Sequence, residues 1–190
     1  RRGMMYLNND QIEEIKKPRN RIEVNIEVDE GKSAKIEKIN IIGNEIFSND
    51  ELLDGFELSE GGFFSFLNND NSYSREKLKG DIESLESFYL DRGYLKFSIE
   101  SSQISLSRDK KEIFITFNVV EGDKYSISDV EVIGDIPFEK ELYQDITNSL
   151  KNLTYNQAQI TGIEEFFKSI LGNQGYAFAE VSGNPDIDED

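Results

Sequence analysis

The sequence contains no cysteine and no histidine among its 190 residues. These absences exclude disulfide bonds, thiol chemistry, histidine-based catalytic triads and the usual zinc sites. No apolar run approaches the roughly 18 residues of a membrane-spanning helix, so we expect no such helix. Basic residues are also scarce, with 21 against 38 acidic ones and a net charge of −17. So acidic a surface repels phosphate backbones, which argues against a nucleic-acid partner.

The residues that are present predict a globular protein without catalytic activity. The chain is 37% hydrophobic, and its 13 Phe and 8 Tyr can build cores. Adjacent carboxylates such as Asp50–Glu51 and Glu164–Glu165 are expected by chance among so many acidic residues. Residues 68–72 and 186–190 carry oxygen ligands at short spacing, as calcium sites do, but they lack the closing Glu of an EF-hand. We therefore predict no enzyme, no cofactor and no metal site.

A strand-like phrase occurs twice, as "DEGKSAKIEKINIIGN" and "VEGDKYSISDVEVIGD". The matched residues all lie 91 positions apart, and they are Glu30 and Glu121, Gly31 and Gly122, Ile36 and Ile127, and Gly43 and Gly134. A second motif, "YLDRGYLKF", recurs near the end as "LGNQGYAFA", and a weaker match lies around Gly3. Internal repetition of this kind indicates an array of similar structural units.

The middle copy predicts a complete β-α-α-β-β unit. A capping-box sequence at Ser48 opens its first helix, and apolar residues at helical spacing mark its second, which Gly93 ends with a left-handed residue. The predicted elements are a strand at 36–42, a helix from Ser48, a helix at 74–92, and strands at 95–106 and 113–120.

The remaining copies are incomplete, which predicts that the chain is a segment of a longer array. Residues 4–28 indicate only a strand-turn-strand hairpin. After the middle unit come a strand at 127–133, helices at 138–150 and 156–171, and a strand at 176–181, with no last strand. The predicted fold class is α+β, with each unit a three-stranded mixed sheet that carries two helices on one face. The predicted domains are 1–31, 32–122 and 123–190.

Tandem β-α-α-β-β units with the phrases "PRNRIEVNIEVDEG", "INIIGN", "YLDRGY" and "ITFNVVEGDKY" resemble the POTRA domains of the Omp85 family. The three predicted domains look like the end of a second POTRA domain, a whole third and a fourth without its last strand. The resemblance implies a periplasmic module that assists outer-membrane β-barrel assembly and is attached through a C-terminal membrane barrel outside this sequence. Implied partners are a BamB-like β-propeller lipoprotein, other assembly lipoproteins and unfolded outer-membrane proteins. The alternatives are a POTRA module of another Omp85-type transporter and a periplasmic adhesin or scaffold without a barrel.

The strand from Leu95 to Leu106 is the predicted binding site. Its apolar alternation breaks at "ESSQ", which predicts a β-bulge or a bend. The family resemblance places this strand at the sheet edge, where free N–H and C=O groups can pair with an added strand. The predicted contact residues are Phe97, Ile99, Ser101, Ser102, Gln103, Ile104, Ser105 and Leu106. The alternative is an edge that the bulge and the polar residues guard and that binds nothing.

A second candidate is the aromatic loop "GGFFSFL" at residues 61–67. Its phenylalanines either pack under the helices or form an exposed apolar contact surface. The residues concerned are Phe63, Phe64 and Phe66.

Overall fold

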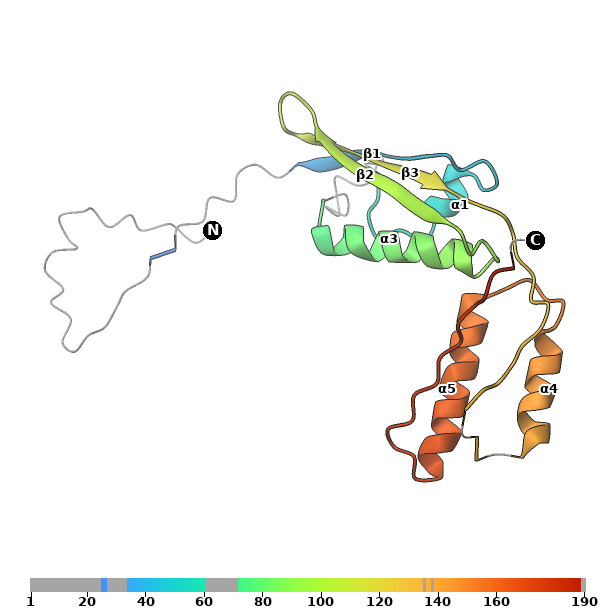
Figure 1. Ribbon diagram of the computed structural model, residues 1–190. Coiled ribbons are helices and arrows are strands. Elements are labelled where there is room, and N and C mark those ends of the chain that lie inside the picture. Colours follow the sequence, from blue (N-terminus) through green and yellow to red (C-terminus); the bar gives the residue numbers. More distant parts are fainter. Residues whose placement is uncertain (1–24, 27–33, 61–71, 135, 138, 189–190) are drawn as a thin grey trace, which may run out of the picture. The chain divides into compact units, whose positions relative to one another are not determined.

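The computed structural model describes residues 25–26, 34–60, 72–134, 136–137 and 139–188. The chain divides into two units, Arg1–Gly31 and Lys32–Asp190 (Figure 1). The predicted hairpin at 4–28 lies almost wholly outside the described residues, as does the aromatic loop with Phe63, Phe64 and Phe66. In the part of the chain that is described, no helix has both the length and the apolar character needed to cross a membrane.

The first repeat folds as a three-stranded mixed sheet with helices, which confirms the predicted fold class. Its elements are β1 (Lys35–Ile42), α1 (Asn49–Leu53), α3 (Arg75–Leu90), β2 (Ser98–Leu106) and β3 (Glu112–Val120). The strand order is β1-β3-β2, with β1 parallel and β2 antiparallel to β3. Figure 1 shows α3 running along the sheet beneath it. The last strand in sequence is therefore the central one, and β1 and β2 are the two edges.

Capping interactions mark the start of α1 and the end of α3. At the start of α1, Ser48 accepts a hydrogen bond from the Glu51 N–H while the Glu51 carboxylate accepts from the Ser48 N–H, a complete capping box. At the end of α3, Gly93 has φ of +92°, and the Tyr94 N–H reaches back to the Tyr89 carbonyl at 3.0 Å. This is the Schellman pattern that the glycine predicted.

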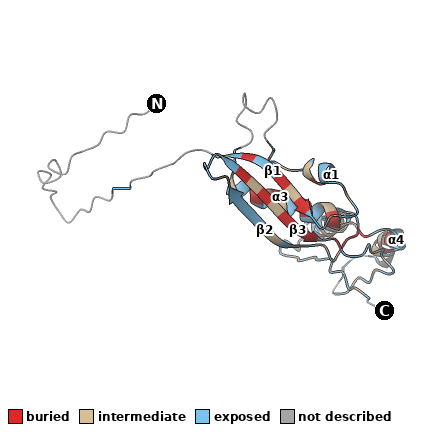
Figure 2. Cartoon of the chain, turned by 90° about the horizontal axis from the view of Figure 1, so that it is seen from above, coloured by how far each residue is buried: buried red, intermediate tan, exposed pale blue. Residues whose placement is uncertain are grey.

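The core lies between the sheet and α3. On β3, Ile113, Ile115, Phe117 and Val119 are buried and alternate with half-buried residues, as Figure 2 shows. This period of two places one face of the strand against the helices. On α3, the buried apolar residues are Leu78, Leu85 and Tyr89.

A buried carboxylate joins three parts of this repeat. Glu121, directly after β3, accepts the Glu45 N–H at 2.8 Å, the Ile46 N–H at 3.0 Å and the Tyr89 hydroxyl at 2.7 Å. Burial, together with the hydrogen bond to this carboxylate, raises the pKa of the Tyr89 phenol well above its usual range, so Tyr89 stays a donor. Glu121 thus holds the segment after β1 and the end of α3 against the end of β3.

Asp81 does the same for the segment that follows α1. Its buried carboxylate accepts the Glu57 N–H at 2.6 Å and the Leu58 N–H at 3.1 Å. Burial raises the pKa of Asp81, and the two backbone hydrogen bonds oppose that rise. Because no β-strand or helix satisfies these two N–H groups, the carboxylate on α3 takes the place of a backbone partner.

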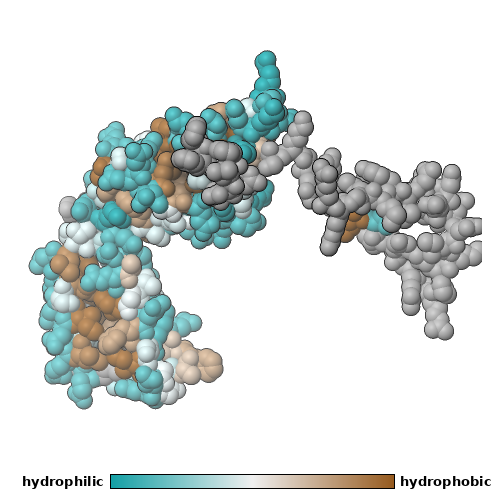
Figure 3. All heavy atoms as spheres, turned by 180° about the vertical axis from the view of Figure 1, so that it is seen from behind, coloured by the Kyte–Doolittle hydropathy of each residue, from teal (hydrophilic) through white to brown (hydrophobic). Residues whose placement is uncertain are grey.

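The second repeat contains both predicted helices, α4 (Lys140–Leu150) and α5 (Gln157–Asn173). The predicted strands at 127–133 and 176–181 are wrong, since neither range forms a strand. In the sheet of the first repeat, the central β3 is the strand with which both β1 and β2 pair. The described residues after 125 include no counterpart of β3, so two potential edge strands have nothing between them to pair with. Some of their apolar residues are exposed, including Ile133 and Phe178 at 82% and 98%. Figure 3 shows apolar surface, in brown, over the second repeat.

Candidate functional site

The strand order confirms that β2 is an edge strand, and the ladder shows which of its backbone groups face outward. The Ser107 N–H donates to the Glu112 carbonyl at 2.9 Å, so Ser107 faces β3. Antiparallel pairs alternate between bonded and non-bonded positions. The register Ser105↔Phe114, Ile104↔Ile115 and Gln103↔Thr116 therefore turns the N–H and C=O of Ile104 away from β3. Ser102 and Leu106 share that outward direction.

The same alternation exposes apolar side chains along this edge. Ile104 and Leu106 lie opposite the buried Ile115 and Ile113, hence on the helix side of the sheet. They are nevertheless 46% and 56% exposed. Figure 2 shows β2 as a largely exposed band beside the partly buried β3. As far as the described residues show, an extended chain added here would meet backbone groups without a partner together with an apolar surface.

The predicted bulge is present, because the register shifts between Ile99 and Ser101 and leaves Glu100 unpaired. On the C-terminal side of the bulge, the Asn118 amide donates to the Ser101 hydroxyl at 2.7 Å and fixes the two strands together. The regular, outward-facing part of the edge therefore runs from Ser102 to Leu106.

Phe97 does not belong to this edge, contrary to the sequence prediction. The strand begins at Ser98, and Phe97 lies in the turn before it, where its N–H donates to the Tyr94 carbonyl. Its ring stacks on Tyr89 with centroids 4.0 Å apart and an angle of 8° between planes. The prediction relied on the alternation of apolar and polar residues. Phe97 fits this alternation, although its ring packs in the aromatic core and its backbone precedes the strand.

The other edge, β1, is guarded. Its outer face carries charged residues, and the Ile39 N–H donates to the Glu60 carboxylate at 2.9 Å. Near its start, Lys35 forms an isolated antiparallel bridge with Ser72. Charges and side-chain caps are the usual means of blocking an edge against added strands. Sequence patterns did not predict this guard, because Glu60 lies 21 residues from Ile39.

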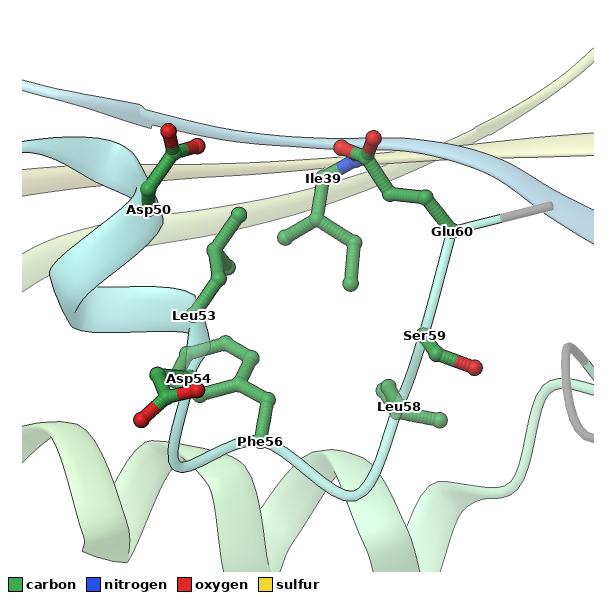
Figure 4. A pocket seen from close by; sticks show the side chains of 8 residues that line it. All are labelled: Ile39, Asp50, Leu53, Asp54, Phe56, Leu58, Ser59 and Glu60. Atoms are coloured by element: carbon green, nitrogen blue, oxygen red, sulfur yellow. The ribbon is translucent and has the colours of Figure 1, made fainter. Parts of the chain in front are cut away.

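A pocket of about 310 Å³ adjoins the guarded edge. Figure 4 shows the Glu60 side chain reaching toward the backbone nitrogen of Ile39 on one side of it, and Asp50 and Asp54 on another. Its lining comprises Ile39, Asp50, Leu53, Asp54, Phe56, Leu58, Ser59 and Glu60. The pocket lies beside β1, at the opposite edge of the sheet from β2. The Ile39 N–H at this edge is already bonded to Glu60. Among the described residues, no group of three or more Asp or Glu is arranged to hold a metal ion.

Comparison with known sequences identifies the repeats. The sequence profile named POTRA, described as "Surface antigen variable number repeat", matches residues 34–122 and again residues 125–190. The chain belongs to the POTRA family. Only residues 123 and 124 separate the two POTRA matches, and the first of them contains the whole β1-β3-β2 sheet.

Curated relatives of these POTRA repeats carry the name "Outer membrane protein assembly factor BamA". The protein from Neisseria meningitidis serogroup B is 32% identical over 168 residues, which are 88% of this chain and 21% of the relative. The protein from Buchnera aphidicola is 34% identical over 170 residues, 89% of this chain and 27% of the relative. The chain thus spans about a fifth to a quarter of the length of these relatives.

A solved structure shows the same fold. The crystal structure of Haemophilus influenzae BamA POTRA3-5 superposes with a TM-score of 0.69 at 26% sequence identity, covering 83% of this chain and 62% of that one. The POTRA fold is therefore common to the sequence profile, the relatives and the structure. The role of β2 in binding stays a prediction.

Proposed function

We propose that this chain is a periplasmic POTRA module of a BamA-like outer-membrane protein assembly factor, and that β2 binds extended strands of unfolded outer-membrane proteins. The relatives and the solved structure support the module. The observation that supports the site is the unguarded β2 edge, where Ser102, Ile104 and Leu106 present their backbone groups outward. In this role the module has no enzymatic activity and is attached to the outer membrane through a barrel that follows it.

Strand addition suits clients that share a conformation but no sequence. Backbone hydrogen bonds supply affinity to any extended chain, and side-chain contacts add only a preference. Here the exposed Ile104 and Leu106 provide an apolar strip on one face, matching the alternate apolar residues of a β-barrel strand. The serines and Gln103 offer neutral polar contacts, so the edge carries little charge of its own apart from Glu100 at the bulge.

The contrast between the two edges indicates which of them binds an added strand. A strand added to β1 would have to displace Glu60 from Ile39 and approach the charged Lys35, Glu37 and Lys38. Among the described residues, no comparable side-chain contact blocks the outward groups of β2. We therefore place client binding, and that of a BamB-like propeller whose blades also end in strands, at β2.

Proline substitution tests this site, because it deletes one N–H donor. Ile104→Pro removes a donor that faces outward, so the repeat should stay folded. Binding to a synthetic outer-membrane strand peptide should weaken by about 5- to 150-fold, the equivalent of roughly 1–3 kcal/mol for a lost hydrogen bond and local distortion. Titration calorimetry measures the affinity, and thermal melting by circular dichroism reports the fold.

Gln103→Pro is the matched control. Its N–H faces β3, so the substitution breaks the β2–β3 ladder and should lower the melting temperature as well as the affinity. The same titration against a purified BamB-like propeller shows whether that partner shares the edge. Unchanged affinity of Ile104→Pro for the peptide would remove β2 from the client site and favour the loop with Phe63, Phe64 and Phe66.

A further inference from the structure

The pocket beside β1 has an apolar floor. Figure 4 shows it between β1, α1 and the segment that follows α1. The floor consists of two buried side chains and two half-buried ones, which are Ile39, Leu58, Leu53 and Phe56. Asp81 holds one wall in place, because its carboxylate accepts two backbone N–H groups of the segment after α1. The pocket is thus part of the folded repeat, and its floor can take the aliphatic part of a ligand.

Three exposed carboxylates surround this floor. Asp50 lies on α1 and Asp54 four residues later at its C-cap, while Glu60 lies on another side of the pocket (Figure 4). Like charges at this helical spacing repel each other. None of the three forms an ion pair with a Lys or Arg of the described residues. A positive charge placed among them would relieve the repulsion, so the pocket is complementary to a cation that carries an apolar stem.

The pocket also adjoins a backbone donor at the sheet edge. The Ile39 N–H on β1 donates to the Glu60 carboxylate at 2.9 Å, and the Ile39 side chain is buried on the helix side of the sheet. Residues that face each other across two strands place their side chains on the same face. An extended segment paired with β1 opposite Ile39 would therefore direct one side chain into the pocket, and its backbone carbonyl would lie where the Glu60 carboxylate now lies.

We propose that β1 and this pocket form a second binding site, which takes an extended protein segment with a lysine or arginine side chain. The aliphatic stem of that side chain packs on the apolar floor, and its charged group lies among the carboxylates. The backbone of the segment replaces Glu60 at the Ile39 N–H, and the released Glu60 carboxylate pairs with the bound cation. A neutral strand offers Glu60 no such partner, so this residue excludes neutral strands from β1 and admits basic ones. The site lies at the opposite edge from β2 and does not depend on binding there.

Two synthetic strand peptides test the site on the whole chain. One carries a single lysine among alternating threonine and valine, and the other carries norleucine at that place, which keeps the stem and removes the charge. Amide NMR titration reports binding at Ile39 separately from binding at Ile104 on β2. At Ile39 we expect the lysine peptide to bind about 3- to 10-fold more tightly than the norleucine peptide, since exposed ion pairs each contribute modestly. Added salt should weaken only the lysine peptide.

Asp54→Asn tests the charge of the pocket. It should weaken the lysine peptide by about 2- to 5-fold and leave the norleucine peptide unchanged, because one ion pair is lost. Asp145→Asn is the matched control, the same substitution at an exposed position of α4 in the second repeat. It should change neither affinity, which separates the pocket from general attraction to an acidic protein.

Glu60→Ala separates the guard from the charge. It leaves the Ile39 N–H without its acceptor, so the norleucine peptide should gain affinity and the preference for lysine should shrink. Glu60→Gln keeps a side-chain oxygen as acceptor and should continue to exclude the norleucine peptide. Thermal melting by circular dichroism shows that each variant is folded. Equal affinities of the two peptides in the parent, an Ile39 amide that does not respond, or equal effects of Asp54→Asn and Asp145→Asn would overturn the proposal.

Discussion

Phe117→Pro is expected to unfold the first repeat. Phe117 is fully buried in the central strand, so its N–H lies in a ladder whichever neighbour it faces. Removing a core phenylalanine side chain costs about 3–5 kcal/mol. Proline adds the loss of a ladder hydrogen bond inside a sheet, where it is rarely tolerated. Together these losses approach the whole stability of a small domain, about 5–15 kcal/mol.

Thermal melting by circular dichroism checks this expectation, with Ile104→Pro as the control that places the same residue at the outer edge. Ile104→Pro should retain the helical signal and a cooperative transition, whereas Phe117→Pro should lose the transition. Two variants that melt alike would contradict the strand order β1-β3-β2, because β2 and β3 would then contribute equally to the fold.

Glu121→Ala is expected to cause the second largest loss of stability. The substitution leaves the N–H groups of Glu45 and Ile46 and the hydroxyl of Tyr89 without their acceptor. Hydrogen bonds to a charged group contribute roughly 1.5–3 kcal/mol each, and an unsatisfied buried donor adds its own cost. We expect the free energy of unfolding of the first repeat to fall by about 3 kcal/mol or more, measured by urea denaturation.

Glu45→Ala is the matched control for this substitution. It also removes one carboxylate, in the segment after β1 that Glu121 binds, but the Glu45 side chain is exposed and its hydrogen bond to Glu121 comes from the backbone N–H. Surface substitutions of this kind usually change stability by less than about 0.5 kcal/mol. Equal losses for Glu121→Ala and Glu45→Ala would show that Glu121 acts only through net charge.

Local sequence signals predicted much of this fold. The capping box at Ser48, the helical spacing of Leu78, Leu85 and Tyr89, and the glycine after α3 each determine structure through neighbours only a few residues away. The break at "ESSQ" predicted the bulge for the same reason. Period and capping are properties of short segments, so a single sequence is sufficient to reveal them.

Contacts between distant residues were missed. Glu121 was visible as one member of a repeated Glu-Gly pair, but nothing near it in sequence showed that its partners are 75, 76 and 32 residues away. The same holds for Glu60 at β1 and for Asp91, whose carboxylate accepts the Ala158 N–H. The Glu-Gly pair that recurs 91 residues apart, once directly after the buried strand β3, was the available sequence signal for a buried carboxylate.

The second repeat shows that a strand needs its neighbours as well as its own residues. The range 127–133 has the β-branched residues of a strand and matches β1 by the 91-residue period. Of its backbone groups, only those of Ile127 bond to another described segment, at Asn152 and Leu153, and the range forms no strand. Strand stability comes largely from cross-strand contacts and ladder hydrogen bonds. Pattern alone therefore predicts which segments can pair, and topology decides which of them do.

Amide hydrogen exchange along β2 tests the central claim most directly. In the free protein, the outward N–H groups of Ser102, Ile104 and Leu106 should exchange quickly, while those of Gln103 and Ser105 are protected by β3. Saturation with an outer-membrane strand peptide should protect the three outward amides and leave the inward pair unchanged. A peptide that binds by calorimetry while Ser102, Ile104 and Leu106 exchange as fast as before would contradict strand addition at this edge.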